Sequence, residues 1–515
     1  MKDNELKKVQ SVEGFLSKEL LDDGHNVIPQ EYETVKKYPL HPPFSYANIL
    51  FDREKLSYLY FVDELRMNQE EDKIFQRLYG FIEESLESPK TSDGKLNFEA
   101  QLDRVVKENE KIFNSNSIVS LEKVKYYLKR DISGFGLIDP LMHDPNIEDV
   151  SCSGSDLPIF IWHRNYDGMK TNIAFKSQEV LNQFIARIVF RAGKHVSSAH
   201  PISDLALQGN HRLAVLYQKE ITPKGTSFTI RKFKEDPYTI VDLINFRTID
   251  IQIAAYLWML IEAKMSVIII GSTGGGKTTI LNAVSGLVPP DFKIFSVEDV
   301  AEINIHHENW FALVSRTGFG SAGEGEIGLY DLIRAGVRHR PDYIVVGEIR
   351  GAEAYVMFQA MATGHGGLCT MHADSLDSAS KRLQQKPMDI PPAYISLMNC
   401  AIVIKRVKDP ATGHTTRRAV AVSEIITANT SHPAFVWNPR SDSFDANLKQ
   451  STLFTRIADS TGRTVEELLA EHAKRTKVLK WMVSNDIRDY KKVTVEVGKY
   501  YKDPEATMRK VEYGV

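Results

Sequence analysis

The chain has few cysteines, no long apolar run and no excess of one charge, and each absence excludes a class of protein. Cys152, Cys369 and Cys400 are too few and too scattered for a disulfide framework or a four-cysteine zinc site. No stretch offers the ~20 apolar residues of a membrane-spanning helix, and the first residues lack the apolar core of a secretory signal. We therefore expect a cytoplasmic protein that reaches a membrane only through a partner.

The charge balance also limits the partners. Sixty-four basic residues against 67 acidic ones leave a formal net charge of -3, which provides no global attraction to nucleic acid or anionic lipid. Hydrophobic residues make up 43% of the chain and charged residues 25%, as in ordinary soluble globular proteins. A length of 515 residues is enough for two or three domains.

Changes in composition and hydrophobic pattern along the chain predict the domain organisation. Residues 1–115 mix charge-rich helical stretches with polar breaks and are expected to form a helical extension that serves for docking. Strand-like and helical stretches in 116–233 indicate a small α/β domain. Residues 234–240 carry proline and charge, which is typical of a linker. Residues 241–515 form the remaining domain, which ends in a helical region.

The last domain shows an alternation of short apolar runs and helical stretches. The runs are SVIIIG, FKIFSVED, DYIVVGEIR, GGLCTMHAD and CAIVIKRV. Continuous apolar strands separated by helices are typical of a sheet that is covered on both faces. The predicted fold class is therefore α/β, with a mostly parallel, doubly wound sheet in this domain.

A phosphate-binding loop follows the first of these runs. GSTGGGKT fits the pattern G-x-x-x-x-G-K-[ST] and lies between a buried strand and a helix. Glycines let the backbone N–H groups turn toward phosphates, and the helix N-terminus adds partial positive charge. Lys277 is expected to neutralise the β- and γ-phosphates and Thr278 to bind Mg²⁺. The predicted nucleotide-binding residues are Gly271, Ser272, Thr273, Gly274, Gly275, Gly276, Lys277, Thr278 and Thr279.

Acidic residues follow two of the other apolar runs. After DYIVVG the second phosphate-loop motif normally ends in an aspartate, but here Gly347 occupies that place and Glu348 follows. We expect Glu348 to act on the metal through water, the alternative being a surface glutamate at a strand end. Glu302 lies at the tip of what we expect to be the neighbouring strand, where side chains face the ligand crevice. A carboxylate there can orient and deprotonate the attacking water, although a helix-capping cluster is an alternative.

Basic and histidine side chains supply further candidates. Arg334 and Arg338 are four residues apart on a predicted helix, so both lie on one face. Such a pair suits phosphate clamping, and a solvated helix face is the alternative. His365 and His372 flank a short apolar run and could sense the γ-phosphate; a zinc site is disfavoured because no third ligand accompanies them.

Taken in order, four motifs resemble the secretion ATPases. They are GSTGGGKTT, VEDVAE, LIRAGVRHRPDYIVVGEIRGAEA and TGHGGLCTMHAD. The upstream stretches GFGLIDPLMHDPNIEDVSCSG and SFTIRKF and the tail FVWNPRSDSF resemble the archaeal-type branch of this superfamily, which drives type II secretion, type IV pilus assembly and the archaellum. The resemblance covers roughly Leu121 to the C-terminus.

The resemblance implies a homo-hexameric ring of two-domain subunits, each with a sensory α/β domain and a RecA-like ATPase domain. It implies ATP and Mg²⁺ as cofactors, with Thr278 and Glu348 at the metal. Glu302 matches the catalytic glutamate, and Arg334 and Arg338 match arginines that stabilise γ-phosphate charge. Of the two histidines in its motif, His372 matches the one that varies less within the family.

The partners implied by the resemblance are a polytopic membrane platform protein and, indirectly, pilin- or archaellin-type filament subunits. This would place the protein at the cytoplasmic face of the cell membrane. Nucleic acid is not an expected partner, although a nucleic-acid translocase or a conjugation-type (type IV) secretion ATPase is an alternative with the same core. A regulatory ring that binds nucleotide without hydrolysing it is a further alternative.

Overall fold

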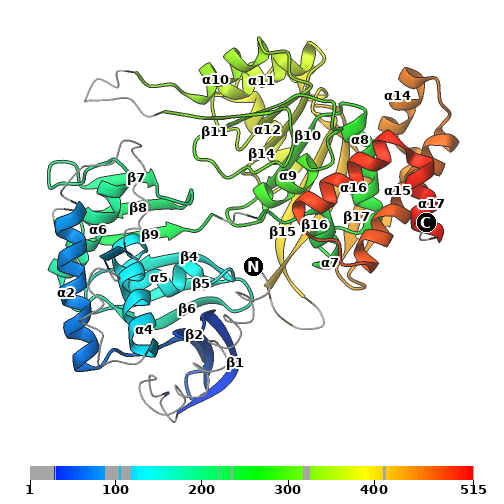
Figure 1. Cartoon of the computed structure of the whole chain (residues 1–515). Coiled ribbons are helices and arrows are strands. Elements are labelled where there is room, and N and C mark those ends of the chain that lie inside the picture. The colour runs from blue at the N-terminus through cyan, green and yellow to red at the C-terminus, as the bar shows by residue number, and fades with distance from the viewer. Residues whose placement is uncertain are drawn as a thin grey trace. The chain divides into compact units, whose positions relative to one another are not determined.

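The computed structural model describes residues 28, 31–86, 102, 104–105, 118–219, 221–233, 236–316, 325–409, 413 and 415–513. The chain divides into two compact units, Met1–Phe233 and Lys234–Val515, which are considered separately (Figure 1). Residues 1–27, 29–30 and 87–101, which belong to the predicted docking extension, lie outside the described residues.

The N-terminal unit contains a sheet in the order β1-β2-β3-β6-β5-β4-β9-β8-β7. Its strands are β1 (Tyr32–His41), β2 (Ser45–Asp52), β3 (Ser57–Glu64), β4 (Ile147–Cys152), β5 (Pro158–His163), β6 (Asp167–Ala174), β7 (Ile202–Ala206), β8 (Arg212–Leu216) and β9 (Ser227–Arg231). Its helices include α2 (Gln69–Leu86), α4 (Ile118–Leu128), α5 (Asp139–His143) and α6 (Gln178–Arg191). All strand pairs are antiparallel except β3 with β6.

Residues 32–64 do not form the helical structure that we expect for the extension of residues 1–115. They form β1, β2 and β3, which continue the sheet of the following α/β domain through the parallel pair Leu59 and Lys170. The stretches SYANILFD and SYLYFVDE are rich in aromatic and apolar residues, which favour a half-buried strand surface. In the described part of this extension, α2 and residues 102, 104 and 105 are helical as predicted.

A buried carboxylate fastens these N-terminal strands to the unit. Asp144 accepts hydrogen bonds of 2.6 Å from the hydroxyl groups of Tyr38 on β1 and Tyr60 on β3. Its second oxygen accepts the backbone and side-chain amides of Asn146. A buried carboxylate is costly unless it is hydrogen-bonded. Since β1 and β3 supply two of the donors to Asp144, both strands are part of the structure of the N-terminal unit.

The C-terminal unit contains a second sheet in the order β12-β11-β13-β14-β10-β15-β16-β17-β18. Its strands are β10 (Val267–Gly271), β11 (Ile294–Glu298), β12 (Trp310–Val314), β13 (Tyr343–Val346), β14 (Gly366–Met371), β15 (Cys400–Lys408), β16 (Thr415–Thr427), β17 (Thr430–Asn438) and β18 (Ser443–Ala446). Pairs from β12 to β15 are parallel, which confirms the predicted mostly parallel sheet. The antiparallel strands β16, β17 and β18 add to the predicted arrangement.

Helices cover both faces of this sheet. They are α7 (Ile240–Asn245), α8 (Ile251–Glu262), α9 (Lys277–Ser285), α10 (Leu329–Val337), α11 (Glu353–Ala362), α12 (Leu376–Gln384), α13 (Pro392–Ile395), α14 (Thr452–Thr461), α15 (Val465–Ser484), α16 (Tyr490–Lys502) and α17 (Pro504–Tyr513). Ile240, which we placed in the linker, is thus the first residue of α7.

The strand β10 shows why the apolar runs are continuous. Val267 and Ile269 pack into the core with α8, α9 and the C-terminal helices, whereas Ile268 and Ile270 pack into the core with α10, α11 and α12. Successive side chains of a strand point to opposite faces, and here both faces are dry. The strand β10 therefore carries no polar side chain, and the phosphate loop follows directly at its end (Figure 1).

Candidate functional site

The loop between β10 and α9 has the backbone shape that a phosphate loop requires. Gly274 and Gly276 have φ values of +66° and +94°, in the left-handed region that other residues rarely adopt. Gly276 is the residue that caps α9, so the helix begins at Lys277 with its N–H groups facing the loop. The glycines in the motif are thus placed where the chain turns into a helix N-terminus.

Lys277 is buried beneath the loop, with 7% of its surface exposed. Its ammonium group donates to the carbonyl oxygen of Ser272 at 3.0 Å and lies 3.2 Å from both ring nitrogens of His372. His372 directly follows β14, which is hydrogen-bonded to β10. The structure therefore brings together the lysine and one of the two histidines that the sequence indicates.

Thr278 lies beside the predicted catalytic glutamate. Its hydroxyl group is 3.4 Å from Oε2 of Glu302. Asn282, one turn further along α9, donates to the carbonyl oxygen of Glu302 at 3.2 Å and accepts from the N–H of Asn304 at 3.0 Å. The first two turns of α9 thus fix the position of the segment that carries Glu302.

The placement of Glu302 differs from the prediction in one respect. β11 follows β10 in the sequence but is not its neighbour in the sheet, because β14 and β13 lie between them. Glu302 reaches Thr278 because the chain continues beyond the end of β11 at Glu298 and returns over the strand ends toward α9. The carboxyl ends of parallel strands lie along one edge of the sheet. Glu302 can therefore reach Thr278 although β11 and β10 are not adjacent strands.

Glu298 is a buried carboxyl group that supports this segment. Its Oε1 accepts hydrogen bonds from the N–H groups of Glu302 and Ile303, at 3.1 and 2.9 Å. Burial raises the pKa of Glu298 to about 8, the two backbone N–H groups opposing this shift. The folded protein therefore holds a proton at neutral pH on a group whose main role here is to hold the backbone of Glu302.

This protonation predicts how stability depends on pH. A pKa raised from 4.5 to about 8 lowers the free energy of unfolding as pH rises through that window, because the unfolded chain has already lost the proton. Glu298→Gln keeps the acceptor and removes the titration. From pH 5 to pH 8 the stability difference should move in favour of Glu298→Gln by on the order of 3 kcal/mol. Denaturant unfolding without nucleotide or divalent cation measures it, and a pH-independent difference would contradict it.

Glu348 and His372 form a second pair at the strand ends. Glu348 follows β13 and its Oε1 lies 3.6 Å from Nε2 of His372. The pKa of His372 is below its ordinary value, mainly because the side chain is partly buried and secondly because the positive charge of Lys277 is near. Arg382 on α12 donates to the backbone carbonyl of His372 at 2.6 Å. These contacts hold a neutral imidazole between the loop lysine and the Glu348 carboxylate.

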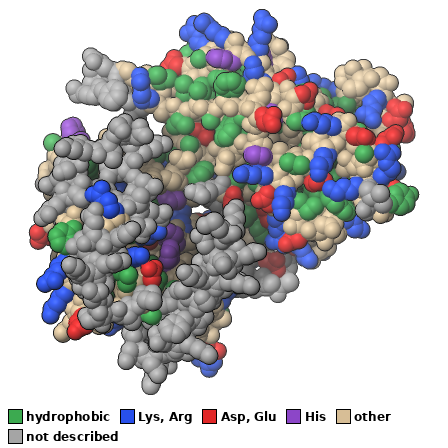
Figure 2. Space-filling model, in the orientation of Figure 1, with side chains coloured by type: hydrophobic (Ala, Val, Ile, Leu, Met, Phe, Trp, Pro, Cys, Tyr) green, Lys and Arg blue, Asp and Glu red, His purple; other side chains and the backbone are tan. Residues whose placement is uncertain are grey.

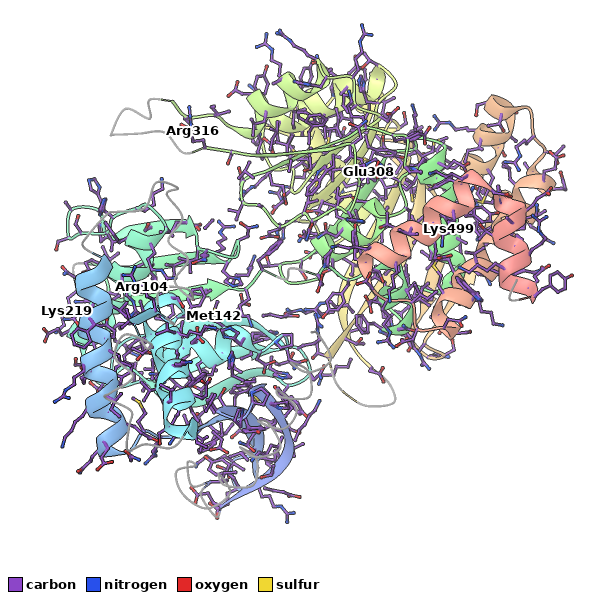
Figure 3. All side chains as sticks on the ribbon, in the orientation of Figure 1. Arg104, Met142, Lys219, Glu308, Arg316 and Lys499 are labelled. Atoms are coloured by element: carbon purple, nitrogen blue, oxygen red, sulfur yellow. The ribbon has the colours of Figure 1, made fainter. Side chains whose placement is uncertain are left out.

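The predicted arginines are not part of this cluster. Arg334 on α10 and Arg338 at its end are exposed, and within the described residues no hydrogen bond or ion pair joins either to the phosphate loop. His365 contacts Ala360 and Thr363 at the far end of β14 rather than the loop. A further arginine, Arg316 in the stretch VSRTG after β12, pairs through its backbone with Ile327 (Figure 3).

Four other arginines approach the site. Arg350 forms an ion pair with Asp299 of the acidic motif, Arg382 holds His372, and Arg406 and Arg417 both donate to the carbonyl oxygen of Gly274. Sequence reasoning missed all four, and the contacts of Arg350, Arg406 and Arg417 join residues that are 51, 132 and 143 positions apart in the chain. The strand-like run CAIVIKRV, which we placed in the sheet, was the only available signal for Arg406.

The donor groups at the site fit a magnesium–nucleotide complex. Within the described residues, no three His, Cys, Asp or Glu side chains gather into a metal cage. Mg²⁺ takes one or two protein oxygens and fills its remaining positions with phosphate oxygens and water. Thr278 at the start of α9 offers a hydroxyl group, and Glu348 offers a carboxylate beyond the end of β13.

Comparisons with known proteins place the chain in a family. Residues 133–467 match the model of the family described as "Type II/IV secretion system protein". The chain belongs to this family. Residues 440–514 also match a model described as "PilB3-like, C-terminal". The resemblance to the secretion ATPase superfamily that we inferred from the four motifs is thus confirmed.

The chain is also similar to individual proteins and to a solved structure. The uncharacterized protein MJ0900 of Methanocaldococcus jannaschii is 35% identical over 389 residues, covering 74% of this chain and 70% of that protein. The type IV secretion system protein PtlH of Bordetella pertussis is 30% identical over 224 residues, covering 38% of this chain and 65% of PtlH. The structure of the Legionella pneumophila ATPase DotB aligns with a TM-score of 0.40 at 15% identity, covering 72% of this chain and 92% of DotB.

Across the part of the chain that the structure describes, no helix combines the length and apolar character needed to cross a membrane.

Proposed function

We propose that this member of the type II/IV secretion family is an Mg²⁺-dependent ATPase that works as a homo-hexameric ring. The observation that carries the proposal is the meeting of four side chains at one edge of the sheet. Lys277 and Thr278 from the phosphate loop lie within 3.4 Å of His372 and Glu302, which arrive from two other strands. This set contains a phosphate-binding cation, a metal-binding hydroxyl group and a carboxylate base.

The roles of the residues follow from their positions. The loop N–H groups from Gly271 to Thr279 would bind the phosphates, and Lys277 would neutralise the β- and γ-phosphates. Thr278, with Glu348 acting through water, would hold Mg²⁺, whose charge polarises the phosphate oxygens. Glu302 would orient and deprotonate the attacking water. A neutral His372 next to Lys277 can donate a hydrogen bond to the γ-phosphate.

Arg334 and Arg338 have a role only if a second subunit contributes to the site. Both side chains are exposed on α10 and neither contacts the phosphate loop of its own chain in the described structure. We propose that they stabilise γ-phosphate charge across a subunit boundary, as an arginine finger does in related nucleotide hydrolases. The site would then be complete only in the assembled ring.

The ring would act on a polytopic membrane platform protein at the cytoplasmic face of the membrane. The PilB3-like C-terminal match supports a machine that assembles a pilus-like filament from pilin- or archaellin-type subunits. The similarity to PtlH supports a type IV secretion system as a second candidate. Charge gives no support to a nucleic-acid translocase, because acidic and basic side chains are interspersed on the face of the C-terminal unit seen in Figure 2.

A pull-down of tagged protein from gently solubilised native membranes tests the assignment of the machine. We expect a polytopic membrane protein and filament subunits among the proteins identified by mass spectrometry. Recovery of a conjugation-type channel would favour the type IV secretion system. Recovery of DNA-processing proteins without a membrane platform would contradict the proposal, and ATP hydrolysis stimulated by added DNA would support that conclusion.

A further inference from the structure

Two arginines from a β-hairpin hold the outer side of the phosphate loop. β15 pairs with β10 up to Gly271, whose register partner is Ile404, and then continues with β16 beyond the body of the sheet (Figure 1). Arg406 on β15 and Arg417 on β16 lie directly opposite each other. Their Nε atoms both donate to the carbonyl oxygen of Gly274, at 3.1 and 3.2 Å.

This arrangement places two positively charged side chains at directly opposite positions of an antiparallel strand pair. Like charges at directly opposite positions of an antiparallel pair repel each other. Here both guanidinium groups converge on one carbonyl oxygen, whose two lone pairs can accept both donors, and hydrogen bonds from charged donors are the stronger kind. A Cβ atom added to Gly274 would lie 2.5 Å from Nη2 of Arg406, so the loop packs directly against the pair.

The hairpin that presents the two arginines is anchored by the next residue. Arg418 is 1% exposed and donates to both carboxylate oxygens of Asp442, at 2.8 and 2.9 Å. It also donates to the carbonyl oxygen of Phe246 at 3.2 Å. Because side chains alternate along a strand, Arg418 fixes β16 from one face while Arg417 reaches the loop from the other.

The peptide between Gly274 and Gly275 is consequently held at both ends. Its oxygen accepts the two arginines, and its N–H donates to the carbonyl oxygen of Ser272 at 3.1 Å. Ser272 is also the acceptor of Lys277. A glycine with positive φ would otherwise sample many backbone conformations, so these contacts limit the shapes available to the loop.

We propose that Arg406 and Arg417 are positioning residues that keep the phosphate loop in the shape that receives the nucleotide phosphates. The proposal rests on the proposed ATPase function and adds two residues to its binding site. They act through Gly274 rather than on the reacting atoms. Their loss should therefore weaken nucleotide binding while leaving the chemical step of bound ATP largely unchanged.

Steady-state ATP hydrolysis by the full chain separates these two effects. Arg406→Ala and Arg417→Ala are each expected to raise KM for ATP about tenfold, as the loss of one charge-assisted hydrogen bond implies, with kcat within about twofold of the wild type. The double variant should raise KM by less than the product of the single effects, because both arginines share one acceptor. Lys405→Ala removes a neighbouring exposed charge from β15 as the matched control and should leave KM unchanged.

A conservative substitution distinguishes position from charge. Arg417→Lys keeps the positive charge and loses the Nε donor, so a positioning role predicts that KM stays raised. Full recovery in Arg417→Lys, or a KM for both alanine variants within twofold of the wild type, would overturn the inference while wild-type hydrolysis leaves the proposed function intact. Loss of kcat together with thermal stability would show a merely structural role. A wild-type chain that neither binds nor hydrolyses ATP would overturn both proposals.

Discussion

Lys277→Ala is expected to abolish ATP hydrolysis, with a rate at least about a thousandfold below that of the wild type. The ammonium group is the only cation inside the described phosphate loop, where it is buried against Ser272 and His372. Alanine leaves the glycine backbone intact but removes the charge that would meet the β- and γ-phosphates. Phosphate release measures the loss of hydrolysis, and the binding of a fluorescent ATP analogue measures the loss of nucleotide affinity.

The control for this variant is another lysine of the same unit. Lys381 lies on α12 in an exposed ion pair with Asp377, and such pairs contribute little to stability. Lys381→Ala should hydrolyse ATP at the wild-type rate. If Lys277→Ala kept a rate within tenfold of the wild type while remaining folded, the loop would not be the site of hydrolysis.

The second large effect is expected for Glu302→Gln, which should bind ATP and retain it without turnover. Glutamine keeps the size of the side chain and an oxygen toward Thr278, which lies 3.4 Å from Oε2 of Glu302. It cannot accept the proton of the attacking water, and loss of a general base typically lowers a rate by about 10²–10⁴-fold. Nucleotide extracted from the protein after gel filtration should be ATP in the variant and ADP in the wild type.

Glu308 provides the matched control, since it is an exposed glutamate on the same connection between β11 and β12 (Figure 3). Glu308→Gln should show normal turnover and retain no ATP. Normal hydrolysis by Glu302→Gln would remove Glu302 from the catalytic role. The base would then have to be sought among the other strand-end carboxylates, of which Glu348 lies closest to His372.

The sequence predicted those parts of the site that are contained in local motifs. Lys277 and Thr278 belong to a pattern whose strand and helix are its immediate neighbours. The sequence indicated both His365 and His372 as sensors of the γ-phosphate, and the structure places His372 beside the loop because β14 pairs with β10. Such features depend on short stretches of chain, and their physical requirements can be stated without a structure.

The remaining features depend on contacts between distant parts of the chain. Arg406 and Arg417 reach Gly274 only because β15 lies beside β10, a pairing that no local pattern specifies. The strand order likewise separates β11 from β10, although the two follow each other in the sequence. The N-terminal strands were predicted as part of a helical extension because residues 1–115 contain charge-rich helical stretches, and the pairing of β3 with β6 was not visible locally.

The most direct test of the account is phosphate release by the purified wild-type chain with ATP and Mg²⁺. We predict steady hydrolysis that stops when EDTA removes the metal and that is absent in Lys277→Ala. The specific activity should increase with protein concentration if Arg334 and Arg338 complete the site of a neighbouring subunit. Stoichiometric ATP binding without phosphate release, in rings of the wild-type chain, would contradict the account and indicate a ring that uses nucleotide only as a structural ligand.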